Sequence, residues 1–273
     1  MKLWQKKQSA HEKIDHFTVG RDREYDLVLA AYDCTASIAH AKMLSKIGLL
    51  TEKESQTLTS ELEALKTLAE ASNFVIEDDF EDMHSKIEFV LTEKLGDLGK
   101  KIHTARSRND QVLVAIHLYL KKEISEIKSL LLGFFNLLME LAENHQNDLM
   151  PGYTHFQVAM PSSFGLWFSA YAESLIDDLT LLNAAQKIVD QNPMGSAAGY
   201  GSSFPIDREE TTQLMAFSGL KYNVMAAQMS RGKAEKITAT GIASVSATLS
   251  KLAMDICLYM SQEFNFITFP DNL

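Results

Sequence analysis

Proline is scarce in this chain of 273 residues: only five occur, and none lies before Pro151. Because proline interrupts helices, its absence leaves three long tracts free to be helical, at residues 106–149, 162–191 and 206–268. Glycine is also uncommon, with 13 residues, which excludes collagen-like and low-complexity chains. The hydrophobic share of 46% is too high for a disordered chain, so we expect a folded globular protein.

Basic residues are fewer than acidic ones, and the resulting net charge is −10. An acidic surface argues against a partner that is a nucleic acid or an anionic membrane, although a few basic residues can still line a pocket for an anionic substrate. No uninterrupted apolar run approaches the ~18 residues of a membrane span. The N-terminal segment lacks the apolar core of a signal peptide. We therefore expect a cytoplasmic protein without membrane or nucleic-acid partners.

Cysteine is nearly absent, and the two that occur, Cys34 and Cys257, have no metal-binding spacing. Two thiols in a reducing compartment are the simplest interpretation, although a single disulfide also fits. The sequence contains no HExxH or CxxC motif and no carboxylate cluster with the spacing of metal ligands. It also lacks the nucleophile elbow of a Ser-His-Asp hydrolase. We expect no metal and no other cofactor.

Helical periodicity dominates what is present. Apolar residues recur in alternating steps of three and four residues over 120–141 and 242–259, which predicts long amphipathic helices. A helix over 108–146 would be about 58 Å long at ~1.5 Å per residue, so it needs equally long neighbours in an elongated bundle. The predicted fold class is all-α.

The first hundred residues predict shorter helices, at 26–47, 51–71 and 80–95. The second of these opens with Thr51 and Glu54 at the spacing of a capping box. Small hairpins are predicted near 149–156 and 192–205, where glycine, proline and aromatic residues gather. We predict an N-terminal helical domain over residues 1–105. The central long-helix bundle domain would then cover residues 106–273.

Three polar segments lie at breaks between predicted helices, where sites are usually built. The first, residues 101–112, contains Arg106, Ser107, Arg108 and Asn109 in succession just before a predicted apolar helix. The helix N-terminus and the arginines would suit a carboxylate, with Ser107, Asn109 or Asp110 as the cap. By itself, a capped helix start with solvated arginines explains the segment equally well.

The second segment, residues 150–161, holds Thr154 and His155 between two prolines. Histidine is the side chain best suited to proton transfer near neutral pH. A partly buried histidine bonded to a backbone carbonyl is the alternative interpretation of this segment.

The third segment, residues 192–208, has three glycines and three serines and by itself indicates only a tight loop. His84 follows an acidic run, and its pattern alone predicts an exposed helix residue.

Together these segments resemble those of argininosuccinate lyases, a family of the fumarase/aspartase superfamily. HTARSRNDQV at 103–112 is similar to HTGRSRNDQV, and PGYTHFQVAMP at 151–161 is similar to PGYTHLQ-A-QP. PMGSAAGYGSSFPIDRE at 193–209 resembles PLGSGAxAGTTFPIDRE, and EDMH at 81–84 resembles EDIH. The order and spacing agree over nearly the whole chain.

The resemblance implies reversible β-elimination of argininosuccinate to arginine and fumarate, in arginine biosynthesis, without metal or organic cofactor. It implies an N-terminal helical domain before a long central bundle, here incomplete. By position, His155 matches the catalytic histidine. The substrate-binding residues implied are Asn109, Thr154, Ser107, Arg108, His84 and Arg231. It also implies a homotetramer whose active sites each combine segments from three subunits.

The sequence departs from the family pattern at three places. The stretch before Arg231, residues 223–230, lacks the acidic residues that the family usually places there. Asp22 stands where the family commonly has a substrate-binding serine. The chain also ends at Leu273, before the GSSxMPxKxNP loop with the family's catalytic serine, so we expect an N-terminal fragment that is inactive alone. The alternatives are a non-catalytic, crystallin-like protein on this scaffold and a sister lyase of the superfamily.

Overall fold

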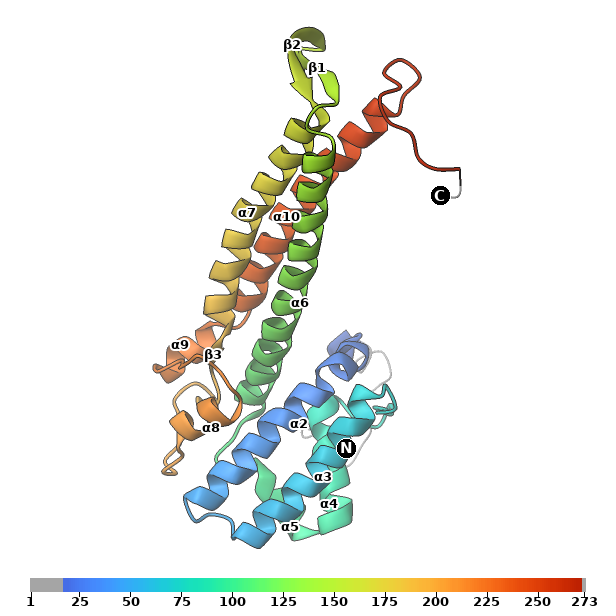
Figure 1. Cartoon of the computed structure of the whole chain (residues 1–273). Coiled ribbons are helices and arrows are strands. Elements are labelled where there is room, and N and C mark those ends of the chain that lie inside the picture. The colour runs from blue at the N-terminus through green and yellow to red at the C-terminus, as the bar shows by residue number, and fades with distance from the viewer. Residues whose placement is uncertain (1–16, 272–273) are drawn as a thin grey trace. The chain divides into compact units, whose positions relative to one another are not determined.

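The computed structural model describes residues 17–271, and the regular elements in this range are helices and four short strands (Figure 1). The chain divides into two compact units. The first combines residues 1–121 with 189–233, and the second combines residues 122–188 with 234–273. The predicted fold class, all-α, is confirmed. This division by compactness differs from the predicted domain boundary between residues 105 and 106, which stays a prediction.

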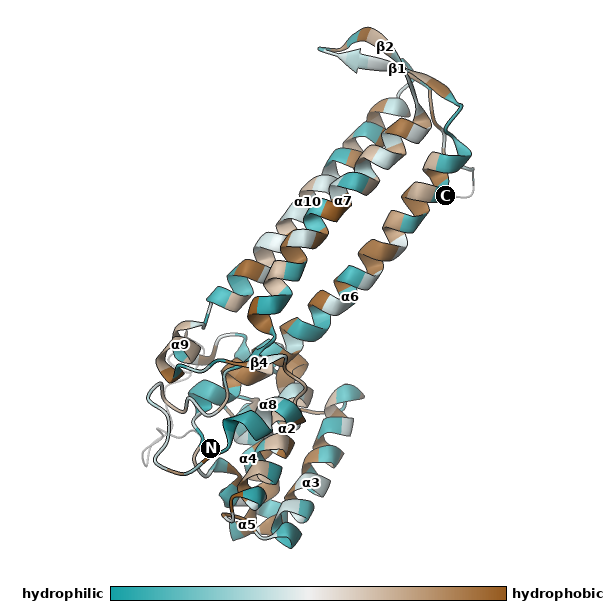
Figure 2. Cartoon of the chain, turned by 60° about the vertical axis from the view of Figure 1, so that its left-hand side comes forward, coloured by the Kyte–Doolittle hydropathy of each residue, from teal (hydrophilic) through white to brown (hydrophobic). Residues whose placement is uncertain are grey.

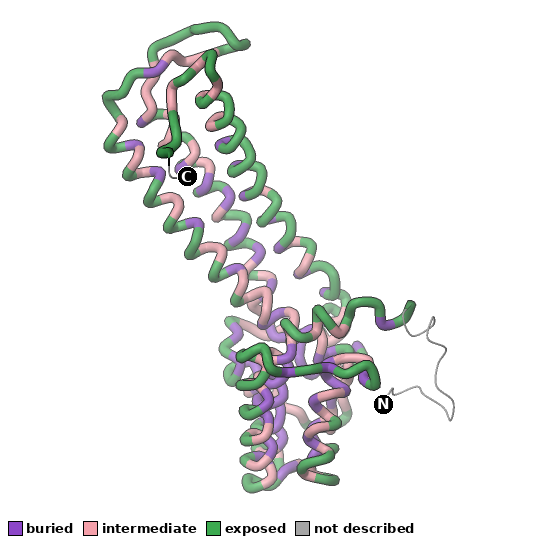
Figure 3. The backbone as a smooth tube through the Cα atoms, turned by 90° about the vertical axis from the view of Figure 1, so that its right-hand side faces the viewer, coloured by how far each residue is buried: buried purple, intermediate pink, exposed green. Residues whose placement is uncertain are grey.

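The first unit is built on a helical hairpin, α2 (Asp22–Lys46) and α3 (Glu52–Glu70). Its remaining elements are α4 (Met83–Leu95), α5 (Asp97–Lys100), the 3-10 turn η1 (Lys101–His103), the beginning of α6 (Arg108–Asn144), β3 (Gln191–Asn192), α8 (Arg208–Leu214), β4 (Gly219–Leu220) and α9 (Val224–Met229). The core contains Leu44, Leu58 and Leu91, which are fully buried. Figure 3 shows many buried residues in the helices of the first unit.

The predicted capping box at the start of α3 is confirmed. Thr51 Oγ1 accepts the N–H of Glu54, and a Glu54 carboxylate oxygen accepts the N–H of Thr51 at 2.8 Å. Asp82 caps α4 in the same position by accepting the N–H of Ser85. Because polar N-caps satisfy amides that have no partner in the helix, these residues fix where the two helices begin.

The second unit is a bundle of three long helices: the remainder of α6, α7 (Phe164–Val189) and α10 (Lys233–Tyr259). Its core is a run of apolar side chains that includes Leu131, Leu138, Leu182, Val245 and Leu252. Apolar residues are interspersed with polar ones along these helices (Figure 2). By length and composition α10 is also apolar enough to cross a membrane, a criterion that the core helix of a soluble bundle meets equally.

Between α6 and α7 lies a hairpin of β1 (Leu149–Thr154) and β2 (Gln157–Ser163), close to the predicted position. The hairpin predicted near 192–205 is wrong. There, β3 pairs in parallel with β4, and residues 193–205 form successive turns with positive φ at Gly195, Gly199 and Gly201.

The tract 206–268, predicted free to be helical, contains α8, α9 and α10 instead of one helix. Asn223 starts α9 afresh, because its side chain accepts the N–H groups of Met225 and Ala226. Gly232, with a φ of +78°, lies between α9 and α10. Capping and a left-handed glycine thus interrupt a stretch that contains no proline.

Candidate active site

The start of α6 forms the centre of the candidate site in the first unit. Ser107 Oγ accepts the N–H of Asn109 at 3.3 Å, and Asp110 Oδ1 accepts the N–H of Ser107 at 2.9 Å. Ser107 therefore caps α6 through the N–H of the second helical residue, while the side chain of the third, Asp110, accepts the N–H of the N-cap residue. Of the three capping candidates from the sequence, Ser107 and Asp110 provide the cap, while Asn109 is exposed at the helix start.

The two arginines of this segment are not solvated. Arg106 is buried and donates from Nη1 to Ser37 Oγ at 2.8 Å. Burial lowers the pKa of Arg106, although Asp33 and Asp110 oppose that effect. Arg108 pairs with Asp82 at 2.5 Å and with Glu88 at 3.3 Å. The guanidinium of Arg108 thus already has two carboxylate partners, one at the N-cap of α4 and one on α4 itself. Its predicted role in binding a substrate carboxylate stays a prediction.

His84 is buried on α4, with 2% of its surface exposed, so the pattern-based expectation of an exposed helix residue is wrong. Its Nδ1 lies 3.1 Å from Oδ1 of Asp33 on α2, and both side chains are shielded from solvent. Burial raises the pKa of the Asp33 carboxyl, but His84, Arg106 and Arg108 outweigh that effect and lower it overall. His84 therefore lies in a buried polar contact between α4 and α2.

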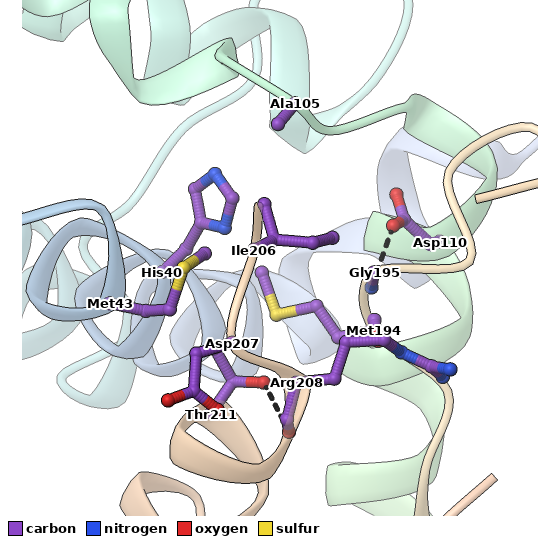
Figure 4. A pocket seen from close by; sticks show the side chains of 10 residues that line it. All are labelled: His40, Met43, Ala105, Asp110, Met194, Gly195, Ile206, Asp207, Arg208 and Thr211. Atoms are coloured by element: carbon purple, nitrogen blue, oxygen red, sulfur yellow. Dashed lines mark hydrogen bonds between the residues drawn. The ribbon is translucent and has the colours of Figure 1, made fainter. Parts of the chain in front are cut away.

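A loop from residues 193–205 is held against the start of α6. Asp110 Oδ2 accepts the N–H of Gly195 at 3.0 Å (Figure 4) and the N–H of Ala197 at 2.9 Å. Beside this contact lies a cavity with a free volume of about 10 Å³, lined in part by His40 and Arg208. That volume suits a single water and is too small for a substrate.

Arg231 is exposed in the turn that follows α9. Its N–H donates to the carbonyl oxygen of Gln228 at 3.2 Å. The Gln228 side chain in turn donates to Ser196 Oγ and to the carbonyl oxygen of Ala197. The segment before Arg231 is therefore tied to the same loop that Asp110 holds.

Thr154 and His155 lie at the tip of the hairpin in the second unit. Thr154 pairs with Gln157, and the two residues between them, His155 and Phe156, have φ angles of +51° and +57°. Two successive residues with positive φ are the signature of the tight type I′ turn. His155 and Thr154 are both exposed there, so the imidazole is accessible to a ligand and the partly buried alternative is wrong.

Contacts along β1 support the hairpin. Pro151 and Pro161, the two prolines that frame the segment, are partners in the strand register. Tyr153 packs edge-on against Phe264, with ring centroids 5.4 Å apart, and lies 6.5 Å from the Phe266 ring. The residue directly before Thr154 is thus anchored on the chain that follows α10.

The seven predicted site residues fall into two groups. The first unit holds Ser107, Arg108, Asn109, His84 and Arg231, and the second holds Thr154 and His155. In the described part of the chain, no group of three or more His, Cys, Asp or Glu side chains is placed to hold a metal ion. Both cysteines are free, Cys34 buried and Cys257 exposed, as the thiol interpretation predicted.

Sequence reasoning assigned no site role to Asp33, although a signal was present. This aspartate lies in the small apolar stretch AAYDCTASIAHA of α2, where a charge is out of place unless it is paired. Gln228 carried no comparable signal, since a glutamine on a short helix is ordinary.

Comparison with known proteins supplies independent information. A family model described as "Lyase" matches residues 7–272. A protein of Parabacteroides distasonis named argininosuccinate lyase is 53% identical over 270 residues, which cover 99% of this chain and 60% of that protein. One of the same name from Thermotoga neapolitana is 40% identical, over 100% of this chain and 68% of its own length. The chain thus spans about 60% of the length of several curated relatives.

Solved structures agree on the fold. A variant of EDDS lyase with bound fumarate superimposes with a TM-score of 0.79 at 25% identity, covering 94% of this chain and 50% of that one. A fumarate lyase described as delta crystallin, from Brucella melitensis, gives a TM-score of 0.73 at 17% identity, covering 88% and 57%. The latter likeness shows the fold alone.

Proposed function

The chain belongs to the lyase family, and from this premise we propose that the protein acts as an argininosuccinate lyase. The observation that carries the proposal is the 53% identity, over 99% of this chain, to a relative of that name. The exposed side chains of Asn109, Thr154 and His155 support it, since each is accessible to a small substrate. The proposed setting is arginine biosynthesis in the cytoplasm.

The reaction breaks one C–N bond and one C–H bond of argininosuccinate. A base removes a proton from the carbon beside a carboxylate, and that C–H electron pair becomes the double bond of fumarate. The C–N electron pair leaves with the guanidinium nitrogen, which takes up a proton to give arginine. Negative charge that develops on the carboxylate needs hydrogen-bond donors placed in advance.

We assign these roles to residues by their accessibility and by the resemblance. His155 gives the departing nitrogen its proton, because imidazole is the side chain best suited to general acid–base catalysis. Thr154 and Asn109 donate to substrate carboxylates, with Ser107, Arg108, His84 and Arg231 as further substrate contacts. The resemblance assigns the role of the base to a serine. In the family pattern this serine lies in a loop that follows the position matched by Leu273.

A homotetramer with shared sites is part of the proposal. The bundle helices expose large apolar side chains, among them Leu130 at 74%, Leu166 at 63% and Met254 at 67%. Apolar surface of this extent on long helices is typical of interfaces between subunits.

The test is a chimera in which this chain is followed by the C-terminal 40% of the Parabacteroides distasonis relative. We expect it to release fumarate from argininosuccinate, measured by ultraviolet absorbance, while residues 1–273 alone release none. A chimera that folds and assembles but releases no fumarate contradicts the proposal and favours the crystallin-like alternative. Turnover of adenylosuccinate or aspartate in place of argininosuccinate points instead to a sister lyase.

A further inference from the structure

A three-residue loop segment in the first unit, Gly195–Ala197, is held from two sides. On one side, the backbone N–H of Gly195 and the backbone N–H of Ala197 each donate to Asp110 Oδ2. On the other, Gln228 Nε2 donates to Ser196 Oγ at 2.9 Å and to the carbonyl oxygen of Ala197 at 3.0 Å. Ala197 is therefore fixed through both its N–H and its C=O.

The backbone of this segment needs such support. Ala197 has a φ of +50°, in the left-handed region that costs an L-residue roughly 1–2 kcal/mol. Gly195, with a φ of +82°, lies so close to Arg208 that an added Cβ would be 2.7 Å from Cγ of that side chain. Strained conformations persist where the surroundings determine them fully, and they cluster at functional sites.

The same two residues are joined to the predicted substrate residues, Asp110 through its side chain and Gln228 through its backbone. Asp110 Oδ1 accepts the N–H of Ser107, and Asn109 is the neighbour of Asp110 in the chain. Gln228 lies on α9 and accepts the N–H of Arg231 at its backbone carbonyl. The segment before Arg231 lacks the acidic residues that the resemblance leads us to expect, and the neutral Gln228 supplies its tie to the loop.

We propose that Asp110 and Gln228 are positioning residues that fix Ser107 and Asn109 relative to Arg231 through the shared Ala197. Both carboxylate oxygens of Asp110 already accept backbone N–H groups, so it acts through the segments it holds. The effect of this positioning on substrate binding rests on the proposed function. The hydrogen bonds that hold the loop segment are independent of that function.

The test measures amide hydrogen exchange by NMR in the 273-residue chain, in Asp110→Asn, in Gln228→Met and in the double variant. Asp110→Asn should speed exchange at Gly195 and Ala197 by about tenfold, as expected for losing hydrogen bonds to a charged group. Gln228→Met should speed exchange at Ala197 and also at Ser107, which Gln228 does not touch. Because both side chains act on one residue, the double variant should be non-additive.

Matched controls are Gln213→Met on α8 and Asp97→Asn on α5, both at exposed positions. They should leave exchange at Ala197 and Ser107 unchanged. Unchanged exchange at Ser107 in Gln228→Met, or additive effects in a double variant that stays folded by circular dichroism, overturns the proposal.

A fumarate titration of the same samples separates this proposal from the proposed function. We expect the Asn109 side-chain amide signal to shift with fumarate in the wild type, and the apparent affinity to fall several-fold in both variants. Equal affinity in wild type and variants overturns the positioning role. Absence of any shift in the wild type counts against the proposed function, while the exchange data still decide whether the two side chains act together.

Discussion

At the scale of single residues, His155 has both an unusual backbone conformation and a proposed role in proton transfer. Its φ of +51° is required by the tight turn, and its ring is exposed at the hairpin tip. Asparagine adopts positive φ more readily than most residues. His155→Asn therefore removes the titratable group without disturbing the turn.

In the active chimera we expect His155→Asn to lower kcat by about 10²–10⁴-fold, the usual contribution of general acid–base catalysis. The melting temperature should stay nearly unchanged. Thr154→Ala is the matched comparison, because it should weaken substrate binding by about 0.5–1.5 kcal/mol, the value of one neutral hydrogen bond. Steady-state kinetics with thermal melts measure both. A normal kcat in His155→Asn rules out its assigned role.

A second residue-scale prediction concerns His40, which is buried on α2 with Nε2 2.8 Å from the carbonyl oxygen of Thr104. Burial, assisted by the Arg106 charge, lowers the pKa of His40 to about 3. The unfolded chain therefore binds a proton at this residue between pH 6.5 and 3 that the folded chain does not. Stability contributed by the neutral ring is present above pH 6.5 and is lost as the pH falls.

Well below pH 6.5, the unfolding free energy contributed by His40 falls by about 1.4 kcal/mol per pH unit. His40→Gln keeps a donor for the Thr104 carbonyl but does not titrate, so its unfolding free energy should fall less steeply with pH. Urea denaturation of both proteins at several pH values between 7 and 4 measures the difference. Parallel pH dependence in the two proteins would show that His40 titrates normally in the folded state.

At the scale of elements, side-chain caps fix where α3 and α4 begin. Loss of an N-cap side chain typically costs about 1 kcal/mol. Thr51→Ala removes the cap of α3, which packs against α2, and we expect the unfolding free energy to fall by that amount. Thr67→Ala on the exposed face of the same helix is the control, and it should be neutral or slightly stabilising because alanine favours helix.

The hairpin and the β3–β4 pair show which elements sequence patterns reveal. The β1–β2 hairpin was predictable because two prolines and a glycine lie in a short break between helices. The parallel pairing of β3 with β4 was not, since each strand has two residues and the partners are 28 positions apart. So short an element has no periodicity to recognise.

At the scale of the whole molecule, exposed apolar residues of the bundle predict association. We expect the 273-residue chain to sediment at a mass well above its 30.5 kDa. Leu130→Lys or Met254→Lys, which place a charge among the exposed apolar residues of the bundle, should reduce that mass. Leu68→Lys on α3 is the control, because Leu68 is exposed in the first unit and should not affect association. Sedimentation equilibrium distinguishes these outcomes, and a monomeric wild type contradicts the expectation.

The sequence by itself determined the helical class, the long helix from Arg108 and the capping of α3, because periodicity and capping are local properties of the chain. It also singled out the segments around Asn109 and His155 by their motifs. Only the tertiary structure decided that His84 is buried against Asp33 and that Asp110 and Gln228 meet at Ala197. These contacts join residues far apart in the chain. Their partners are set by packing, which no local pattern encodes.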